Sequence, residues 1–472
     1  MDDFMQAFSV GLSAVNDFVW GPIMLVFLVG TGVFLMIRLK GRPLTKLGYA
    51  LRQVFARSSI KKSDTQGQGD ITPFQSLMTA LAATIGTGNI VGVATAMTLG
   101  GPGALFWMWV AAVFGLATKY AESVLAVKYR VVNQDGQMAG GPMFALKNGF
   151  KVKWLGSLLA ILFSLFAVIA SFGIGNLTQG NSISEALQTT FQVPTWLTGI
   201  IVAVLAAIVV LGGITSIGSV SAKIVPFMAV FYAIGGIVCI VINADQLPQG
   251  LHDIFVAAFS PQALGGGFAG ITMVSAMRFG VARGVFSNEA GLGSAPIAAA
   301  AAKTDHPCRQ GYINMTGTFF DTIIVCTLTG LVIASSGLVG TVDPATGEVL
   351  TGATLTISAF SSGLGQIGAY IVTLGLVLFA FSTILGWEYY GEKSLEYLVK
   401  SDKVRFVYRL IFSVVAFFGC VTTLDLVWDF SDTANGLMAI PNLISLIVLS
   451  GVVVKLTQEY DTEFIAKERR RR

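Results

Sequence analysis

Long apolar stretches separated by short polar segments run along the whole chain. A helix that crosses a bilayer needs ~20 predominantly apolar residues. Eleven stretches meet that length, at residues 15–37, 72–98, 102–126, 155–175, 196–215, 224–243, 267–290, 311–335, 366–390, 406–424 and 434–455. Basic residues follow the first stretch and none precede it, which indicates a retained helix and not a signal peptide. The pattern therefore predicts an all-α polytopic membrane protein with 11 transmembrane helices.

The composition agrees with this prediction and excludes several classes of protein. Of the 472 residues, 54% are hydrophobic and 12% are charged, and the mean hydropathy is +0.73. Soluble domains carry about 25% charged residues, so a soluble enzyme or a nucleic-acid-binding protein is excluded. The cysteines lack CxxC spacing, the two histidines stand far apart, and neither HExxH nor GxSxG occurs. We therefore expect a protein that is not an enzyme and that has no cofactor.

Lysine and arginine are distributed unevenly between the loops. They follow stretches one, three, five, seven and nine, beginning with the basic segment 38–62, and four arginines end the chain at 469–472. The alternate loops contain none, near residues 1–14, 176–195, 244–266, 336–365 and 425–433. Because cytoplasmic loops hold the positive charge, we expect the N-terminus outside and the C-terminus inside, in the plasma (bacterial inner) membrane. The basic segments are expected to contact anionic headgroups.

This orientation divides the helices into two groups of opposite direction. Helices two to six start inside and helices seven to eleven start outside. Two groups of five helices with opposite orientation are typical of an inverted repeat. We therefore predict a leading helix with a basic amphipathic connector (1–71), a first five-helix repeat (72–243), a second five-helix repeat (244–455, with outer loop 244–266) and a basic cytoplasmic tail (456–472). The alternative is eleven helices without internal symmetry.

Inverted-repeat transporters bind substrate and ions where the first helix of each repeat is unwound. In the second stretch the tetrad Gly86-Thr87-Gly88-Asn89 lies between two apolar halves. Glycine costs a helix ~1 kcal/mol relative to alanine, so this tetrad predicts a break. The half-helix after the break would present free N–H groups to a carboxylate, and the half before it would present carbonyls to a cation. The alternative, helix packing through small residues, does not explain the two polar side chains.

The seventh stretch, which opens the second repeat, carries the other predicted interruption. Arg278, Gly280, Arg283 and Gly284 interrupt its apolar run midway. Charge inside a membrane is costly and normally faces a cavity or a partner. We expect Asp321, in the next stretch, to be the counter-charge for Arg278 or Arg283 in a structural ion pair.

Five further side chains are candidates from position alone, and each has two interpretations. Ser382 and Thr383 either complete an oxygen shell for sodium or bond back to their own helix. Gln179 either lines an outward vestibule or is an ordinary loop residue. Phe279 and Trp387 either form walls of a small pocket or serve packing and the membrane interface.

Several segments resemble the alanine or glycine:cation symporter family. The longest is GGPGALFWMWVAAVFG at residues 100–115, and the others are ATIGTGNIVGVATA, RGVFSNEAGLGSAPIAAAAA and STILGWEYYGEKSLEY. The resemblance extends over essentially the whole chain. It implies a leucine-transporter-like five-plus-five fold with broken first helices and one extra N-terminal helix. It also implies sodium-driven uptake of alanine or glycine, although some relatives prefer glutamine.

The same resemblance implies roles for individual residues. The substrate would bind at Gly86, Thr87, Gly88 and Asn89, with Gln179 as its polar neighbour and Phe279 and Trp387 as apolar walls. One sodium ion would lie between the carbonyls of Ala82 and Ile85 and the hydroxyls of Ser382 and Thr383. A second sodium ion would involve Thr84 and Asn89.

These observations favour a sodium-coupled symporter that imports a small neutral amino acid, alanine or glycine, by alternating access. We expect it to work as a monomer in the lipid bilayer, with no nucleic-acid partner. The alternatives within the fold are a sodium-coupled glutamine or serine symporter and a proton-coupled amino-acid permease. Proton coupling needs a carboxylate or a histidine at the site; neither histidine lies there, and Asp321 is expected to pair with an arginine. A channel or a sensor fits two opposed repeats less well.

Overall fold

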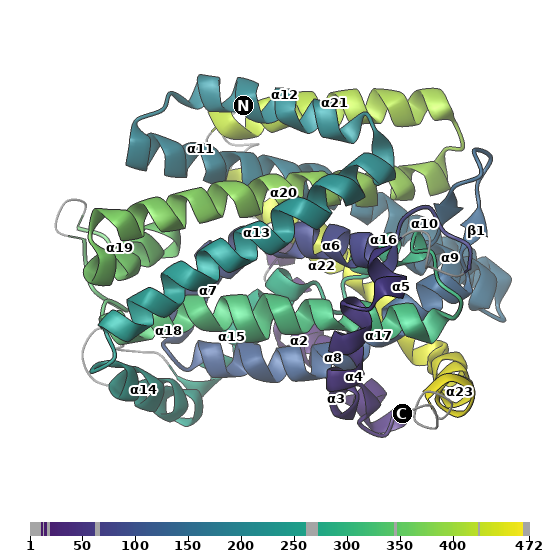
Figure 1. Ribbon diagram of the computed structural model, residues 1–472, viewed down its shortest axis with the longest axis horizontal. Coiled ribbons are helices and arrows are strands. Elements are labelled where there is room, and N and C mark those ends of the chain that lie inside the picture. Colours follow the sequence, from purple (N-terminus) through teal and green to yellow (C-terminus); the bar gives the residue numbers. More distant parts are fainter. Residues whose placement is uncertain are drawn as a thin grey trace.

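The computed structural model describes residues 11–12, 14–16, 19–61, 67–260, 272–343, 347–422 and 425–465, with the backbone alone for 425–431 (Figure 1). The arginines predicted to end the cytoplasmic tail, the first ten residues and part of the outer loop 244–266 lie outside the described residues.

The described chain is almost entirely helical. Six helices are long and apolar enough to cross a membrane: α8 (Ala104–Lys128), α10 with α11 (Lys153–Phe191), α13 (Gly213–Ile242), α17 with α18 (Pro307–Ser336), α20 (Gln366–Leu398) and α21 (Asp402–Val421). The count rises to eight if two bent pairs each form one span, and α2 (Pro22–Arg38) and α12 (Thr195–Val210) are shorter apolar helices. An all-helical membrane protein with broken helices is therefore confirmed, and the count of eleven spans stays a prediction.

Short elements connect these helices. On the basic connector they are α3 (Arg42–Thr45), α4 (Leu47–Val54) and α5 (Arg57–Ile60). Between α8 and α10 lie the antiparallel strands β1 (Val131–Val132) and β2 (Met138–Ala139), followed by α9 (Pro142–Gly149). Three predicted outer loops contain helix instead: α11 (Thr178–Phe191), α14 (Leu247–Phe259) and α19 (Gly352–Leu364). The prediction that these segments face outward rests on their lack of basic residues, and it does not depend on whether they are helical.

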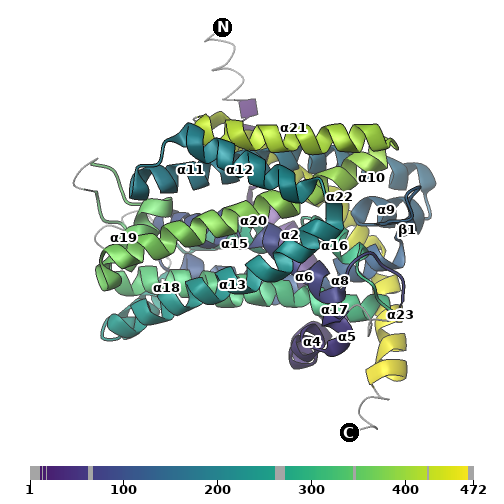
Figure 2. The same ribbon diagram turned by 45° about the horizontal axis from the view of Figure 1, so that its top comes forward.

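The long helices form two groups, and the helix that precedes the predicted break lies between them. Helices α12 and α21 lie side by side at one edge, next to α11 and α20, in both ribbon views (Figures 1 and 2). Helix α8 contacts α15 (Met273–Asn288) and α17 on the opposite side. Helix α6 (Pro73–Thr84) contacts members of both groups, including α13, α20 and α17. A break in α6 is therefore placed where both groups can reach it.

The break in α6 lies at the predicted tetrad. The helix begins with Pro73 in its first turn and a capping box in which Thr72 and Gln75 bond each other's backbone N–H. It ends at Ile85, whose backbone is extended, and the chain continues through the π-helical turn η1 (Gly88–Gly92) into α7 (Val93–Gly100) after a bend of 53°. Gly86 is required at this point, because a Cβ there would lie 2.4 Å from Thr383 Oγ1.

The interruption predicted for the seventh stretch is misplaced. Helix α15 runs unbroken from Met273 to Asn288, through both of its interior glycines. Those glycines serve packing: a Cβ on Gly280 would lie 2.3 Å from the carbonyl oxygen of Ala104 on α8. The chain breaks after α15 instead, where Gly291 and Gly293 have φ values of +100° and +86°, before α16 (Ala295–Ala300) begins. The remaining bent pair is formed by α22 (Asp425–Val448) and α23 (Ser450–Tyr460), the latter followed by η4 (Asp461–Ile465).

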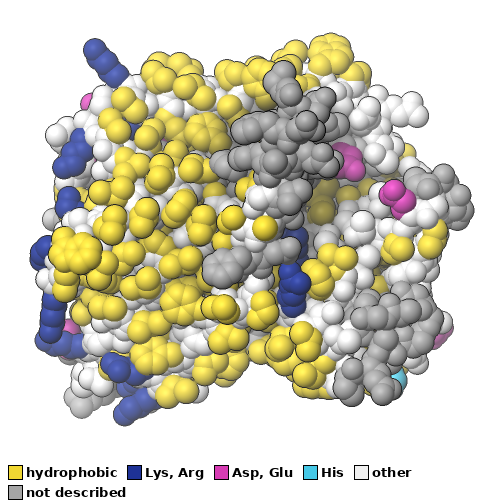
Figure 3. Space-filling model, turned by 180° about the vertical axis from the view of Figure 1, so that it is seen from behind, with side chains coloured by type: hydrophobic (Ala, Val, Ile, Leu, Met, Phe, Trp, Pro, Cys, Tyr) yellow, Lys and Arg dark blue, Asp and Glu magenta, His cyan; other side chains and the backbone are white. Residues whose placement is uncertain are grey.

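The surface matches a protein embedded in lipid. Large apolar side chains such as Ile208, Phe227 and Val414 are more than half exposed on α12, α13 and α21. Figure 3 shows a broad apolar face with lysine and arginine side chains gathered along its left edge. An apolar belt bounded by basic side chains is the pattern expected where a membrane meets the cytoplasm.

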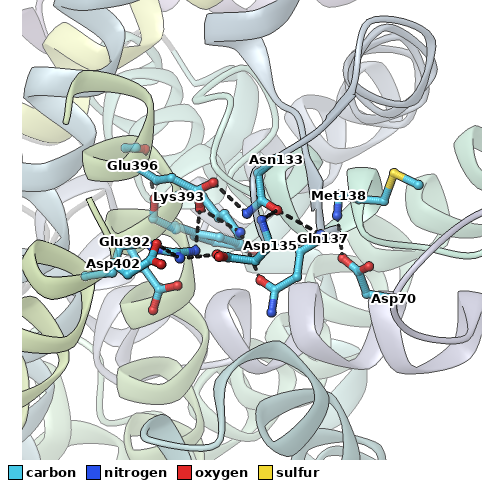
Figure 4. A network of polar contacts seen from close by, with 12 residues as sticks. Asp70, Asn133, Asp135, Gln137, Met138, Glu392, Lys393, Glu396 and Asp402 are labelled. Carbon is cyan, nitrogen blue, oxygen red and sulfur yellow. Dashed lines mark hydrogen bonds and ion pairs between the residues drawn. The ribbon is translucent and has the colours of Figure 1, made fainter. Parts of the chain in front are cut away.

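A polar network closes one end of the molecule at the strand hairpin (Figure 4). On α20, Glu396 accepts hydrogen bonds from Asn133 Nδ2 (2.8 Å) and Lys393 Nζ (2.7 Å), and Arg405 pairs with it from α21. Lys393 is nearly fully buried and also reaches Gln137 of the hairpin at 3.4 Å. The hairpin is therefore bonded to the ends of α20 and α21.

The same hairpin also contacts the chain just before α6. Asp70 Oδ2 accepts a hydrogen bond from the backbone N–H of Met138 at 2.8 Å (Figure 4). Arg130, at the end of α8, donates to the carbonyls of Ala300 and Ala302 at 2.8 and 2.7 Å. These bonds hold the start of α6 and the end of α16 against the closed end of the molecule.

Candidate functional site

A small buried cavity of about 20 Å³ lies at the break between α6 and α7. Its walls come from the break itself, from the junction of α10 and α11, from the end of α15, and from α20 and α22. Of the residues predicted to bind substrate, Gly86, Thr87, Gly88, Gln179 and Trp387 line it. A cavity of this size holds little more than one water molecule, so an amino acid can bind there only if the walls move apart.

Side chains satisfy the backbone groups that the break releases. Gly86 N donates to Asn89 Oδ1 at 3.0 Å, and Thr87 N reaches Gln179 Oε1 at 3.4 Å. The amide of Gln179 donates to Thr87 Oγ1 at 3.2 Å and to the carbonyl of Ile174 at 2.9 Å. Gln179 is held in this position because π-helical turn η2 (Gly173–Leu177) continues α10 into α11. It is therefore a buried helical residue, and the loop interpretation was wrong.

Four oxygen atoms converge where α6 meets α20. Ser382 Oγ lies 3.2 Å and Thr383 Oγ1 lies 3.1 Å from the carbonyl oxygen of Ala82, and Thr383 Oγ1 is also 3.5 Å from that of Ile85. Both hydroxyls bond back to Phe379 O as well, at 2.9 and 3.0 Å. The bonds to Phe379 O confirm that both hydroxyls bond back to their own helix, and the sodium site stays a prediction. Carbonyl and hydroxyl oxygens gathered in a buried place are the ligands that a hard cation prefers.

Asp321 lies next to the break and not next to an arginine. On the π-helical segment η3 (Phe319–Cys326), its carboxylate accepts hydrogen bonds from Asn89 Nδ2 (2.8 Å), Ser287 Oγ (2.9 Å) and Thr322 Oγ1 (2.8 Å). The predicted ion pair between Arg278 and Asp321 is therefore wrong, because both carboxylate oxygens are held by neutral donors.

The two arginines of α15 lie in another cavity, of about 150 Å³. Arg283 pairs with Asp432 of α22 at 3.7 Å, and the guanidinium of Arg278 lies 5.5 Å from the ring centre of Phe279. Phe279 lines this second cavity and not the one at the break. The prediction that Phe279 walls the site was wrong: Phe286, two helical turns further along α15, lines both cavities.

Thr84 has a modest role in the geometry. It lines the cavity, and its hydroxyl lies 3.3 Å from the carbonyl of Leu81 in its own helix. Its partner in the predicted second sodium site, Asn89, is fully buried and joins Gly86 to Asp321.

Sequence reasoning missed two polar residues of the cavity, Glu289 and Asn435. Glu289 follows α15 directly, and its backbone is left-handed with φ +56°. A signal was present: the run Asn288-Glu289-Ala-Gly-Leu-Gly places a carboxylate and two glycines immediately after an apolar stretch. Such a run predicts a turn as well as a polar group at depth in the membrane. Asn435 lies inside a helix and has no comparable signal.

Comparisons with known proteins agree on one family. The sequence profile described as "Sodium:alanine symporter family" matches residues 5–472. The sodium/alanine symporter AgcS of Methanococcus maripaludis is 54% identical over 453 residues, which are 95% of this chain and 96% of that protein. The probable sodium/glutamine symporter GlnT of Bacillus subtilis is 37% identical over 446 residues, with 94% and 89% of the two chains covered.

Solved structures show the same arrangement of helices at low sequence identity. MhsT, solved in complex with L-phenylalanine, superposes with a TM-score of 0.57 at 11% identity, over 82% of this chain and 98% of that one. A nucleobase-cation-symport-1 family transporter in a closed conformation superposes with a TM-score of 0.50 at 14% identity, over 82% and 78% of the two chains. At these identities the likeness concerns the fold alone.

Proposed function

The chain belongs to the sodium:alanine symporter family, and from this premise we propose that it imports a small neutral amino acid, alanine or glycine, together with sodium. Transport would proceed by alternating access, with the two groups of helices moving relative to each other around the break in α6. The observation that carries the proposal is the convergence of the broken helix with the hydroxyls of Ser382 and Thr383.

In this proposal one sodium ion binds at the contact between α6 and α20. Its ligands are the carbonyl oxygens of Ala82 and Ile85 and the hydroxyls of Ser382 and Thr383. Both hydroxyls already lie within hydrogen-bonding distance of the Ala82 carbonyl oxygen, and Thr383 also reaches that of Ile85, which supports their assignment to one ion. A second sodium ion is proposed at Thr84 and Asn89, and the carboxylate of Asp321 beside Asn89 supports it with negative charge.

The amino acid would bind in the neighbouring cavity. Its carboxylate would take the N–H groups of Thr87 and Gly88, where the start of a helix favours negative charge. Gln179 would leave the backbone of Thr87 and bind the substrate, while Trp387 limits the size of the side chain. Coupling follows because both ligands order the same unwound segment, so each raises the affinity for the other.

We propose the finer architecture on the same basis. The chain would have eleven spans, with one leading helix (region 1–71) and two inverted five-helix repeats (72–243 and 244–455) ahead of the tail 456–472. The N-terminus would lie outside and the C-terminus inside, which the basic edge in Figure 3 supports. The self-contained core supports a functional monomer.

A second candidate is sodium-coupled glutamine transport, favoured by the 37% identity to a probable sodium/glutamine symporter. Alanine or glycine remains the first candidate because the cavity is about 20 Å³, and the larger side chain of glutamine would require a larger displacement of Phe286 or Trp387.

A binding experiment distinguishes transport of alanine or glycine from transport of glutamine. Thermal stability of the purified protein would be measured in detergent with sodium or potassium, and with alanine, glycine, glutamine or leucine. The proposal predicts stabilisation by alanine and glycine only when sodium is present. Stabilisation by glutamine alone would transfer the proposal to the second candidate, and stabilisation independent of sodium would refute coupling.

A further inference from the structure

Glu289 is a buried carboxylate in the wall of the cavity at the break. It is 2% exposed and lines the same cavity as Thr87 and Trp387. One carboxylate oxygen, Oε2, accepts a hydrogen bond from Ser294 Oγ at 2.6 Å. The side chain of Trp387, in the wall of the same cavity, also donates a hydrogen bond to this carboxylate. A carboxylate held, among the described residues, by neutral donors alone therefore lines the cavity that also contains the backbone of Thr87 and Gly88, at the start of a helical segment.

The charges around this carboxylate do not balance. Lys119 on α8 is buried and interacts electrostatically with Glu289, Glu122 and Asp321. Its ammonium group donates to the carbonyl oxygen of Asn288 at 2.6 Å. Around the break, the described residues thus place three buried carboxyl groups near one buried lysine. A buried carboxylate is stable only when it is paired, and otherwise it takes up a proton, so a positively charged ligand would stabilise the ionised form of this cluster.

We propose that Glu289 binds the ammonium group of the transported amino acid. The inference rests on the proposed function and assigns one residue to recognition of the substrate. The amino acid would lie with its carboxylate on the N–H groups of Thr87 and Gly88 and its ammonium on the carboxylate of Glu289. Each end of the zwitterion is then met by opposite charge from the lining of one cavity, and charge-assisted hydrogen bonds are about twice as strong as neutral ones.

Glu122 provides a matched control. It is buried to the same degree in the same charged cluster, but it does not line the cavity. Its Oε1 accepts hydrogen bonds from Gly291 N at 3.0 Å and from Asn442 Nδ2 at 2.7 Å, so it holds the turn after α15 against α22. Removing its charge alters the electrostatics of the cluster without removing a group that faces the substrate.

The experiment measures binding of labelled alanine in saturating sodium to the wild type, Glu289→Gln and Glu122→Gln. The inference predicts at least a ~30-fold loss of alanine affinity for Glu289→Gln, the range of a removed charge-assisted bond. Stabilisation by sodium alone should persist in that variant, and Glu122→Gln should bind alanine within about threefold of the wild type. Equal alanine affinity in Glu289→Gln and the wild type would overturn the inference.

Competition on the wild type tests the same point without a variant. Alaninamide keeps the ammonium group of alanine, and lactate replaces it with a hydroxyl. The inference predicts that lactate fails to displace alanine at concentrations where alaninamide does displace it, and lactate competing as well as alaninamide would overturn it. A wild type that binds no alanine in sodium would instead refute the proposed function, so the two failures are distinguishable.

Discussion

Replacing Gly86 by alanine adds one methyl group to the site. This change should weaken sodium binding more than a methyl group added at any other position of the site. A Cβ at this position would lie 2.4 Å from Thr383 Oγ1 and 3.3 Å from Gln179 Oε1, whereas an ordinary contact starts at 3.4 Å. The added methyl thus presses on one proposed sodium ligand and one proposed substrate ligand. Thr383 is buried among fixed carbonyls and cannot turn away freely.

The magnitude follows from the packing. Overfilling a close-packed site costs roughly 1–3 kcal/mol, and a clash with a buried hydroxyl belongs near the middle of that range. A cost of about 2 kcal/mol corresponds to about a 30-fold rise in the sodium concentration for half-maximal uptake, since 1.4 kcal/mol is tenfold. The assay is initial uptake of labelled alanine into proteoliposomes over a series of sodium concentrations.

Gly92→Ala is the matched control. A Cβ at Gly92 would meet only the carbonyl oxygen of Thr87, at 4.0 Å. Alanine also favours the helix by ~1 kcal/mol over glycine, so this variant should keep the wild-type sodium dependence and melt no lower than the wild type. The reasoning is refuted if Gly86→Ala keeps the wild-type sodium dependence, or if both variants lose it equally.

Three further predictions follow from other contacts. Thr87→Ala removes the hydroxyl that Gln179 bonds and should reduce alanine uptake at least tenfold, by roughly 1.4 kcal/mol, with an unchanged elution profile; full uptake would remove the break from the site. Ser382→Ala combined with Thr383→Ala should raise the half-saturating sodium concentration while leaving the protein folded, and an unchanged value would make both hydroxyls packing groups. Burial raises the pKa of Asp70 above its ordinary value, so the folded protein loses stability as the pH rises and this carboxyl group ionises. Asp70→Asn keeps an oxygen that can accept the hydrogen bond from Met138 N, and it should raise the melting temperature more at pH 7 than at pH 4. A larger increase at pH 4 would contradict this reasoning.

The break in α6 was predictable because its cause is local. Two glycines, a threonine and an asparagine interrupt a stretch that is otherwise apolar, and no partner helix is needed to recognise that such a tetrad weakens a helix. The contact of Ser382 and Thr383 with the carbonyls of α6 depends on the fold, and it could be expected only through the resemblance to a known family. Their role as sodium ligands stays a prediction.

The break after α15 was misplaced because glycine has two uses that look alike in a sequence. Gly280 lets α15 approach α8 closely, whereas Gly291 adopts a left-handed backbone that ends the helical run. These two uses of glycine can be distinguished only when the position of α8 is known. The misplaced break also shifted the predicted wall from Phe286 to Phe279, which is seven residues earlier on the same helix.

The prediction that Asp321 is the counter-charge of Arg278 or Arg283 was wrong for a similar reason. The sequence orders residues along each helix but does not fix the depth at which two helices meet. Asp321 was expected to meet an arginine, but η3 places it against Asn89 at the break, while Arg283 meets Asp432 of α22. Glu289 was overlooked because a carboxylate directly after a helix usually marks a solvated turn, and here that turn is buried.

Uptake of labelled alanine by proteoliposomes that contain the purified protein tests the central proposal most directly. An inward sodium gradient is compared with an equal potassium gradient and with an equal proton gradient, and glycine and leucine are added as competitors. The account predicts accumulation of alanine that requires the sodium gradient and is blocked by glycine but not by leucine. Accumulation driven by protons and indifferent to sodium would contradict it.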